Sequence, residues 1–276
     1  MPSSPTAMDP AQPAVTVLIG AYDNESTVSR AIASILGQTE ASLELIVIDD
    51  GSSDRSAAVA QEAIGSDPRG RVIRLERNVG IARSLNAGME AAATPIVAIQ
   101  DADDYSAPNR LARELGVLAA DPEVAVVGAR MREVDSGGGV LCPRTTFASG
   151  DVGPVLPRFN PIPNSSAMFR RGIALALGGY DPRYRYAAEY DLWLRIGERH
   201  RIVALDEELC TRVMGGSNVA ARAERDQLAE GIAIRVRALR RRRTLKGAGG
   251  LLRPLVSYAL PAPVKRALRK RRGQAP

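Results

Sequence analysis

Short apolar runs alternate with helical segments between residue 14 and about residue 130 of this chain. The apolar runs are rich in β-branched residues and occupy residues 15–20, 43–48, 72–75 and 96–100. Apolar residues at helical spacing follow each of these runs. Strands that are apolar almost throughout, and that alternate with helices, are typical of a parallel sheet covered on both faces. The sequence therefore predicts an α/β fold.

Polar residues follow three of the four predicted strands. The first strand leads into Gly20 and Tyr22, the second into Asp50, and the fourth into Asp101 and Asp103. In parallel sheets, ligands bind at the carboxyl ends of the strands, where the strand order reverses. One aromatic ring and several carboxylates at such an edge suit a nucleobase, a ribose and a metal-bound diphosphate.

Each of these segments also has a purely structural interpretation. Residues 49–54 can be explained as a turn and a helix cap without any binding role. An isolated Asp-x-Asp can likewise lie in a solvated loop. Asp101 and Asp103 come straight after an apolar strand, however, and burying such acids without a cation costs several kcal/mol. Their position therefore favours a cation site. Arg83 can contact a phosphate, although a solvent-facing helical arginine is the simpler interpretation.

The scarcity of histidine and cysteine limits the chemistry of the chain. Its 276 residues include one histidine, His200, and two cysteines, Cys142 and Cys210. They cannot build a His/Cys zinc site, and a Ser-His or Cys-His mechanism would depend on His200 alone. Two distant cysteines make no disulfide framework, which fits a reducing cytoplasm. Any metal would be held by carboxylates, the ligands of hard ions such as Mg²⁺ or Mn²⁺.

The formal net charge of +6 is unevenly distributed. From Arg235 to the C-terminus there are 14 Lys and Arg and no Asp or Glu, so residues 1–234 carry a net charge of −8. A nucleic-acid-binding domain carries its positive patch on the folded face, so we expect no nucleic-acid partner. Apolar residues accompany the basic ones: Leu251, Leu252, Leu255, Val256, Tyr258 and Leu260. We expect this tail to bind an anionic membrane surface, the alternative being a disordered, solubilising tail.

The ends of the chain and its second half are less regular. Residues 1–13 hold four prolines and predict a disordered lead-in that lacks the features of a signal peptide. The longest apolar stretch, 255–264, is too short for a membrane span. Beyond residue 130, a proline-rich loop at 143–163 comes first, and a strand or helix at 167–177 follows it. We then expect a helix at 189–199, two short strands at 202–205 and 209–213, and a last helix at 219–243.

Several segments resemble family-2 glycosyltransferases. Residues 15–54 (VTVLIGAYDNESTVSRAIASILGQTEASLELIVIDDGSSD) resemble the opening of that family, with its Ser-Ile-Leu-x-Gln and Asp-Asp-Gly-Ser-x-Asp elements. Residues 78–104 (NVGIARSLNAGMEAAATPIVAIQDADD) resemble its Asp-x-Asp block. Three later segments resemble the acceptor half of the family: NPIPNSSAMFRR, GGYDPRYRYAAEYDLWLR and LCTRV. The elements keep the family's order and spacing over about residues 14–218, so the chain is identified as a member.

The resemblance implies the GT-A fold, with a Rossmann-like, mostly parallel sheet. It implies transfer of a sugar, with inversion at the anomeric carbon, from a nucleotide diphosphate donor to a hydroxyl of a glycan or lipid-linked acceptor. We expect a UDP-sugar as the donor. The implied organisation is a glycosyltransferase domain at 14–218, a C-terminal helix at 219–243 and a basic tail at 244–276. Within the domain, residues 14–130 would bind the nucleotide sugar and 131–218 the acceptor.

The same resemblance assigns roles to the strand-end residues. Tyr22 would flank the nucleobase and Asp50 would hydrogen-bond it. Asp101 would face the ribose or a metal-bound water, and Asp103 would bind the Mn²⁺ or Mg²⁺. Gly20 and Arg83 complete the expected donor site.

The catalytic position departs from the family's pattern. The family's Glu-Asp pair corresponds to Ala188 and Glu189, so we expect Glu189 to be the general base. Helical spacing places Glu189 on the packed side of its helix and predicts a solvated ion pair between Asp191 and Arg195. The helix N-terminus should keep Glu189 ionised.

Two further departures leave a second function class open. Asn164 and Met214 stand where relatives often carry histidines near the acceptor or the diphosphate. The alternative is a non-catalytic nucleotide-sugar-binding or scaffolding protein of the same fold, and the intact Asp-x-Asp favours the enzyme. Dehydrogenase, NTPase and nucleotidyltransferase functions are disfavoured, because the sequence lacks their glycine-rich phosphate-binding loops. We expect the protein in the cytoplasm or on the cytoplasmic face of the membrane.

Overall fold

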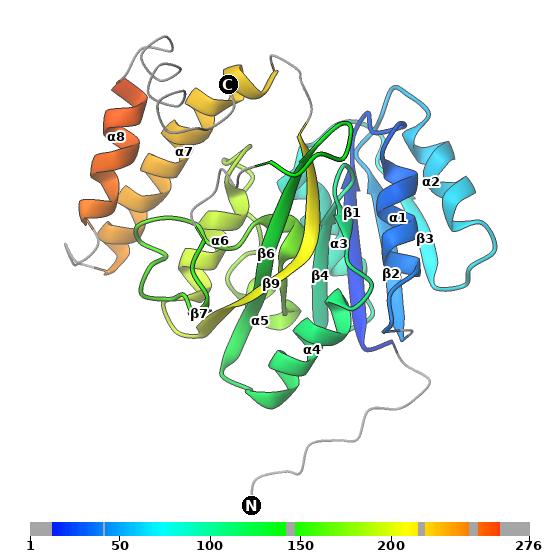
Figure 1. Ribbon diagram of the computed structural model, residues 1–276, viewed down its shortest axis with the longest axis horizontal. Helices are drawn as coiled ribbons and strands as arrows, with labels where there is room; N and C mark the ends of the chain where they lie inside the picture. The colour runs from blue at the N-terminus through cyan, green and yellow to red at the C-terminus, as the bar shows by residue number, and fades with distance from the viewer. Residues whose placement is uncertain (1–12, 41, 142–146, 215–218, 243–247, 260–276) are drawn as a thin grey trace, which may run out of the picture.

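The computed structural model describes residues 13–40, 42–141, 147–214, 219–242 and 248–259 (Figure 1). The expected lead-in up to residue 12, Cys142 and the basic tail beyond residue 259 lie outside the described residues.

One nine-stranded sheet has the order β3-β2-β1-β4-β8-β6-β9-β5, with β7 beside β9, within the described residues. The first four strands pair in parallel: β1 (Val15–Ala21), β2 (Leu43–Asp49), β3 (Gly70–Arg74) and β4 (Ile96–Asp101). The predicted α/β fold with a mostly parallel sheet is thereby confirmed.

Helices cover both faces of this sheet, which explains why its strands are apolar almost throughout (Figure 1). Val17 of β1 shares one buried cluster with residues of α1 and α4, while Leu18 belongs to the cluster that includes residues of α3 and α6. Each fully buried aliphatic side chain contributes about 1.5–3 kcal/mol. The helices of the first half are α1 (Val28–Leu36), α2 (Ser56–Ile64), α3 (Ile81–Ala91) and α4 (Arg110–Ala120).

The second half of the chain continues the same sheet. Strand β8 (Met168–Arg170) runs antiparallel to both β4 and β6, and the helix α5 (Arg171–Ala176) follows it directly. The smaller elements are β5 (Tyr105–Ser106), β7 (Gly150–Asp151), η1 (Asn164–Ser166) and η2 (Ala248–Leu251).

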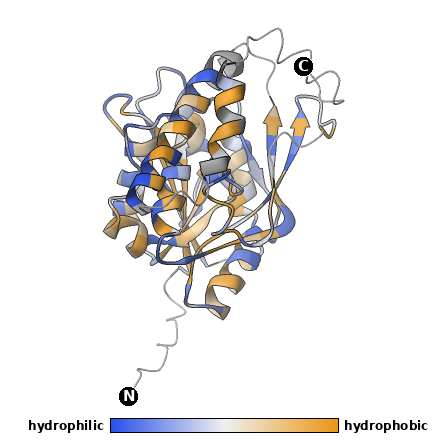
Figure 2. Cartoon of the chain, turned by 90° about the vertical axis from the view of Figure 1, so that its left-hand side faces the viewer, coloured by the Kyte–Doolittle hydropathy of each residue, from blue (hydrophilic) through white to orange (hydrophobic). Residues whose placement is uncertain are grey.

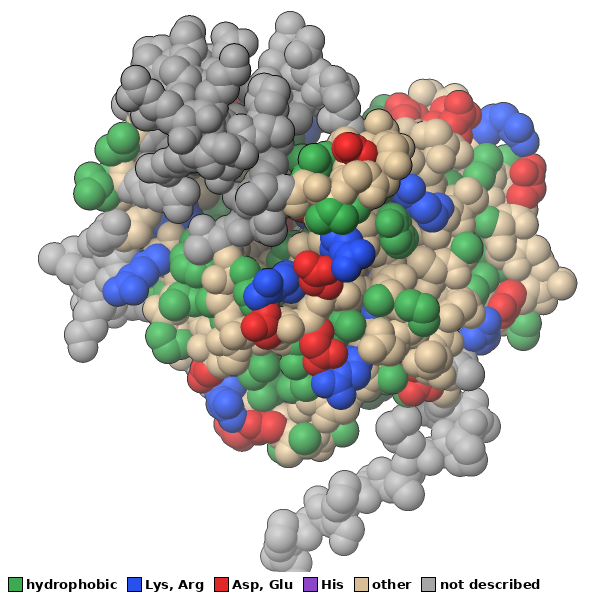
Figure 3. Space-filling model, in the orientation of Figure 1, with side chains coloured by type: hydrophobic (Ala, Val, Ile, Leu, Met, Phe, Trp, Pro, Cys, Tyr) green, Lys and Arg blue, Asp and Glu red, His purple; other side chains and the backbone are tan. Residues whose placement is uncertain are grey.

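The prediction of two short strands at 202–205 and 209–213 is wrong, because β9 (Arg201–Met214) is continuous. It pairs in parallel with β6 (Val124–Asp135), and shifts in register near Arg130 accommodate the acidic residues in between. Two of those acids pair with arginines of β6: Asp206 with Arg130, and Glu208 with Arg132. Acidic and basic side chains accordingly lie next to one another on this face of the molecule (Figure 3).

The last three helices are α6 (Ala188–Ile196), α7 (Val219–Arg242) and α8 (Leu252–Ala259). Helix α6 ends three residues earlier than predicted: Gly197 is its C-cap, and the backbone N–H of Gly197 donates to the carbonyl oxygen of Trp193. Helix α7 packs against both α6 and α8. Figure 2 views the molecule from the α7–α8 side, where hydrophobic and hydrophilic residues alternate along the helices. Among the described residues, no helix is long and apolar enough to cross a membrane.

Candidate active site

The strand order reverses between β1 and β4, and a pocket of about 640 Å³ opens at the carboxyl ends of these strands. Gly20 of β1 pairs with Asp101 of β4, so the two strands deliver these residues to the same point. A Cβ atom at Gly20 would lie 2.4 Å from the Ile81 Cδ1 atom of α3, so a larger residue there would require this side chain to move. Gly20, Asp101 and Asp103 all line the pocket.

The wall of the pocket that comes from the second half carries Glu189, at the second position of α6. Asn160 and Tyr180 line the pocket beside it. The structure thus brings the predicted base into the same cavity as the two predicted metal-binding aspartates, which lie 86 or more positions earlier in the chain.

Two predicted donor-binding residues do not line this pocket. Asp50 is buried, and its two carboxylate oxygens accept hydrogen bonds from the backbone N–H groups of Val79 (2.8 Å) and Gly80 (2.9 Å). It therefore holds the turn before α3. Arg83 is exposed and donates to the Val79 carbonyl oxygen (3.3 Å), as a solvent-facing arginine can, and its contact with a phosphate stays a prediction.

Tyr22 also lies outside the pocket lining, although its neighbour Asn24 belongs to it. The Tyr22 side chain is 45% exposed at the end of β1, and its backbone N–H donates to Asn24 Oδ1 (2.9 Å). Between them, Asp23 has a φ of 52°, in the left-handed region that aspartate and asparagine tolerate best after glycine. Asp23 therefore suits the conformation of this turn.

Asn164, noted as a departure from the family, holds one of the aspartates in place. Its Nδ2 group donates to Asp101 Oδ1 (3.1 Å), and its Oδ1 atom accepts from the Tyr180 hydroxyl (3.0 Å). Burial, followed by the charge of Glu189, raises the pKa of Tyr180 well above its usual value, so Tyr180 remains a donor. Tyr180 joins the site through this contact, which no pattern in the sequence predicts. Met214 does not line the pocket.

The carboxylates after β4 disfavour one another's charge. Although Asp103 as a whole is exposed, partial burial of its carboxyl and then the charge of Asp101 raise its pKa. Asp104 is buried, and burial and the same Asp101 raise its pKa to about 7; it accepts from Ser165 Oγ (2.6 Å). Within the described ranges, no group of three or more His, Cys, Asp and Glu is arranged to hold a metal. Asp101 and Asp103 are hard oxygen donors whose repulsion a divalent cation would relieve, so this pair fits Mn²⁺ or Mg²⁺ completed by substrate phosphates.

Glu189 does not stay fully ionised at neutral pH, contrary to the expectation from its helix position. Burial raises the pKa of its carboxyl to about 7, opposed by its own backbone N–H and reinforced by Asp101. Asn160 Nδ2 donates to Glu189 Oε1 (3.1 Å) and is a site residue that the sequence did not reveal. A carboxyl with a pKa near 7 is suited to general base catalysis at physiological pH.

The ion pair between Asp191 and Arg195 is present, but the expectation that it is solvated is wrong. Arg195 Nε lies 2.6 Å from Asp191 Oδ2, and Asp191 is only 1% exposed. Helix α7 covers this face of α6, with Arg241 Nη1 at 3.7 Å from Asp191 Oδ1. Asp191 therefore helps hold the two helices together and does not line the pocket.

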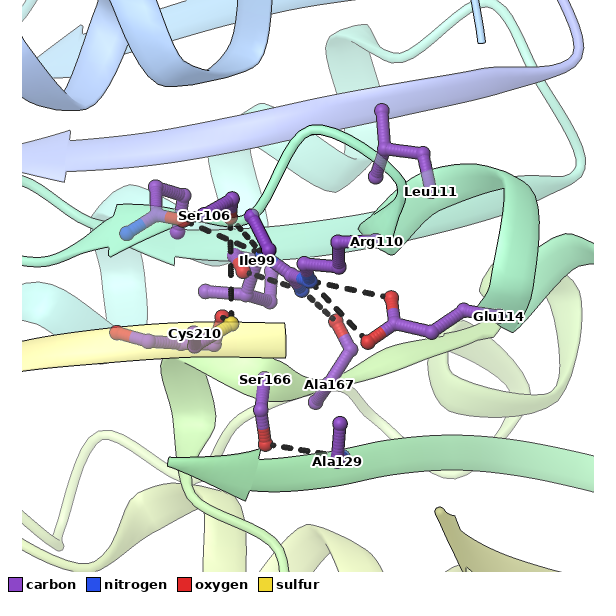
Figure 4. Close-up of polar contacts among 12 residues, drawn as sticks. Ile99, Ser106, Arg110, Leu111, Glu114, Ala129, Ser166, Ala167 and Cys210 are labelled. Atoms are coloured by element: carbon purple, nitrogen blue, oxygen red, sulfur yellow. Dashed lines mark hydrogen bonds and ion pairs between the residues drawn. The ribbon is translucent and has the colours of Figure 1, made fainter. Parts of the chain in front are cut away.

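A buried arginine supports the strand that ends in Asp101 (Figure 4). Arg110 and Glu114 of α4 are both fully buried, with Arg110 Nε at 3.1 Å from Glu114 Oε1. The remaining nitrogens of Arg110 donate to Gln100 Oε1, Ser106 Oγ and the carbonyl oxygens of Ile99 and Ala167. Since residues 99 and 100 directly precede Asp101, this network fixes the strand end on which the site is built.

We expect Arg110→Ala to lower the free energy of unfolding by about 3–5 kcal/mol, because it leaves Glu114 buried without a partner. Urea denaturation followed by circular dichroism measures this. Arg113→Ala, one turn away, is the matched control: its side chain is 55% exposed and pairs with Glu207 at the surface, so the loss should be below about 1 kcal/mol. Equal losses in the two variants would contradict a structural role for the network.

The sequence of this chain is similar to those of a known protein family. Residues 16–172 match the family described as Glycosyl transferase family 2. The chain belongs to this family. It is a glycosyltransferase, and it has the family's GT-A fold.

Two relatives show how this family-2 chain compares in sequence. It is 29% identical over 207 residues to the amylovoran biosynthesis glycosyltransferase AmsE of Erwinia amylovora, covering 74% of this chain and 77% of AmsE. It is 33% identical over 189 residues to the putative glycosyltransferase EpsE of Bacillus subtilis, covering 67% of each.

Solved structures share the fold at low sequence identity. TarS 1–349 of S. aureus in complex with UDP superposes with a TM-score of 0.62 at 17% identity, over 82% of this chain and 70% of TarS. The mannosyltransferase PcManGT of Pyrobaculum calidifontis, in complex with GDP-Man and Mn²⁺, gives a TM-score of 0.67 at 19% identity, over 97% of this chain and 82% of PcManGT.

Proposed function

We propose that this glycosyltransferase transfers a sugar, with inversion, from a UDP-sugar to a hydroxyl of a glycan or lipid-linked acceptor in polysaccharide biosynthesis. One observation carries the proposal: Asp101 and Asp103 from the first half of the chain and Glu189 from the second half line the same pocket. Solved relatives hold UDP, UDP-GlcNAc or GDP-Man, and AmsE is named for amylovoran biosynthesis.

The chemistry needs one proton acceptor and one site for the leaving group. Glu189 takes the proton from the acceptor hydroxyl, whose oxygen forms a bond to the anomeric carbon while the bond from that carbon to the diphosphate oxygen breaks. Attack opposite the leaving diphosphate gives inversion. Asn160 holds Glu189 Oε1, and the chain from Tyr180 through Asn164 holds Asp101.

Asp101 and Asp103 are the residues that would hold Mn²⁺ or Mg²⁺. A divalent cation bound there would supply positive charge to the diphosphate as it leaves. The protein's part is to keep two carboxylates together on the ligand edge of the sheet. The cost is visible in the pKa of Asp103, which partial burial and the charge of Asp101 raise.

A thermal-shift screen of UDP, GDP and dTDP, each with Mn²⁺, tests the donor assignment, because a ligand that binds only the folded state raises the melting temperature. UDP should give the largest shift. Hydrolysis of the corresponding nucleotide sugar then separates an enzyme from a non-catalytic binding protein of the same fold. Binding of UDP without any hydrolysis or transfer would favour the non-catalytic alternative.

We also propose that the C-terminal region binds the cytoplasmic membrane surface. Apolar side chains of α8 face solvent, Leu252 at 68% and Val256 at 50% exposure, together with Leu255 and Tyr258. Residues from Arg235 onward carry basic charge without any acid. Basic residues that adjoin an exposed apolar helix in the sequence are the features of a peripheral anchor on anionic lipid.

We expect the full chain to co-sediment with phosphatidylglycerol vesicles and a 1–246 truncation to remain in the supernatant. Each basic residue close to the anionic surface contributes about 1 kcal/mol, and the truncation removes seven of the 14 basic residues together with the exposed apolar side chains of α8. Vesicles of phosphatidylcholine alone are the control and should retain little protein. Equal sedimentation of the two proteins would exclude the anchor.

A further inference from the structure

Glu230 of α7 is bonded to the segment that leads into α6. Its carboxylate accepts the backbone N–H groups of three consecutive residues: Arg185 (2.8 Å, to Oε1), Tyr186 (2.8 Å, to Oε2) and Ala187 (3.1 Å, to Oε2). Successive backbone N–H groups that converge in this way form an anion-binding concavity, and here the anion is a side chain of the protein itself.

This contact lies where the active site needs support. Ala187 is the N-cap of α6, and its side chain cannot accept a hydrogen bond, so the helix has no cap of its own. Glu189 is two residues further on, and Arg185, Tyr186 and Ala187 line the pocket beside it. A carboxylate at the positive end of α6 therefore stabilises both the helix start and the pocket wall.

The same helix α7 supplies part of the pocket wall. Gln227, Leu228, Gly231 and Arg235 line it, and their spacing places them on one face of α7, next to Glu230. Further along, ion pairs join α7 to the α6 side: Arg241 contacts Glu198 (2.9 Å) and Asp191 (3.7 Å). Residues after 218, which the family match at 16–172 does not include, thus reach the catalytic pocket.

We propose that Glu230 is a positioning residue, which fixes the start of α6 and thereby the place of the Glu189 carboxyl in the pocket. Docking of α7 then completes the active site, since Glu230 connects the C-terminal helix to the base. The inference rests on the proposed role of Glu189. It assigns α7 a part in turnover in addition to any part in membrane binding.

Full-length Glu230→Ala and Glu230→Gln test this, with Asp226→Ala as the matched control, an exposed acid of α7 outside the pocket lining. Three quantities are measured: amide hydrogen exchange over residues 185–191, affinity for UDP with Mn²⁺, and kcat and KM for hydrolysis of UDP-GlcNAc or of the nucleotide sugar found in the donor screen.

In Glu230→Ala, the amides of 185–187 should exchange faster and kcat should fall about 10- to 100-fold, because a misplacement of about 1 Å can cost about 10²-fold. UDP affinity and KM should stay within about twofold, since the donor site lies on β1 and β4. Glu230→Gln should retain more activity, because its amide oxygen still accepts hydrogen bonds, and it serves as the comparison if Glu230→Ala does not fold. Asp226→Ala should match the wild type.

A kcat within about twofold of wild type for folded Glu230→Ala would overturn the inference. So would a loss of UDP affinity as large as the loss of kcat, which would mark general damage to the fold. Glu189→Gln, measured in parallel, distinguishes an error in the positioning role of Glu230 from an error in the assignment of Glu189 as the base. If Glu189→Gln is inactive and Glu230→Ala is active, the positioning role alone is wrong; if Glu189→Gln is active, the assigned base is wrong and the positioning role falls with it.

Discussion

Glu189→Gln is expected to lower kcat by about 10²–10⁴-fold, the usual effect of removing a general base. Glutamine keeps the size of the side chain and can still accept the hydrogen bond from Asn160, but it cannot take a proton from the acceptor. Affinity for UDP should be unchanged, because Glu189 comes from α6, whereas the proposed donor-binding residues lie at the ends of β1 and β4. The measurement is steady-state transfer or donor hydrolysis, with UDP binding followed by calorimetry.

The pH dependence provides a second reading of the same residue. Because the pKa of Glu189 is raised to about 7, the wild-type kcat/KM should rise with pH up to about 7 and level off above it. The residual activity of Glu189→Gln should lack this rise. A carboxyl whose folded-state pKa exceeds its unfolded value lowers stability as pH rises from about 4.5 to 7, so the variant should be at least as stable as wild type at pH 8.

Glu90→Gln is the matched control, since Glu90 is an exposed acid of α3 outside the pocket lining, and it should keep full activity. Asp191→Asn should lower thermal stability, because Asp191 is buried against Arg195, while the folded fraction keeps its turnover. Near wild-type turnover of Glu189→Gln, once a true acceptor is supplied, would place the base elsewhere.

Local patterns account for the parts of the fold that the sequence predicted. Strands such as β1 are buried on both faces, so continuous apolar runs between helices indicated a covered parallel sheet before any contact was known. The same logic brought Gly20 and Asp101 to one edge, because parallel strands present their carboxyl ends together. The inward direction of Glu189 followed from helical spacing alone.

Contacts between distant segments could not be predicted in this way. Asn160 reaches Glu189 across 29 positions, and Asn164 reaches Asp101 across 63, with no periodic pattern that marks either pair. Helical spacing predicted the pairing of Asp191 with Arg195, whereas its burial depends on α7, which begins 28 residues after Asp191. Burial also explains why Glu189 is less ionised than its helix position predicts: the helix N-terminus is a local effect, while burial depends on the whole pocket.

Asp103→Asn is expected to reduce transfer at least about 100-fold, since loss of a divalent cation at a leaving diphosphate removes several kcal/mol of transition-state stabilisation. Asparagine keeps the shape of the side chain and removes its charge. Wild-type activity should likewise disappear in excess EDTA and return with Mn²⁺, and UDP should bind tightly only with the cation. Cation binding without nucleotide should be weak, because two carboxylates leave most of the coordination to substrate phosphates and water.

Stability separates this effect from damage to the fold. The pKa of Asp103 is raised by partial burial and by Asp101, so ionisation of Asp103 above its ordinary pKa of 3.8 opposes folding. Without a cation, Asp103→Asn should therefore be at least as stable as wild type at pH 7. Asp206→Asn is the control: it removes a surface ion pair with Arg130 and should leave transfer unchanged. Full activity of wild type in EDTA, or of Asp103→Asn with Mn²⁺, would show that the aspartates after β4 do not hold a catalytic cation. Their role would then be limited to contact with the ribose and to the turn before α4.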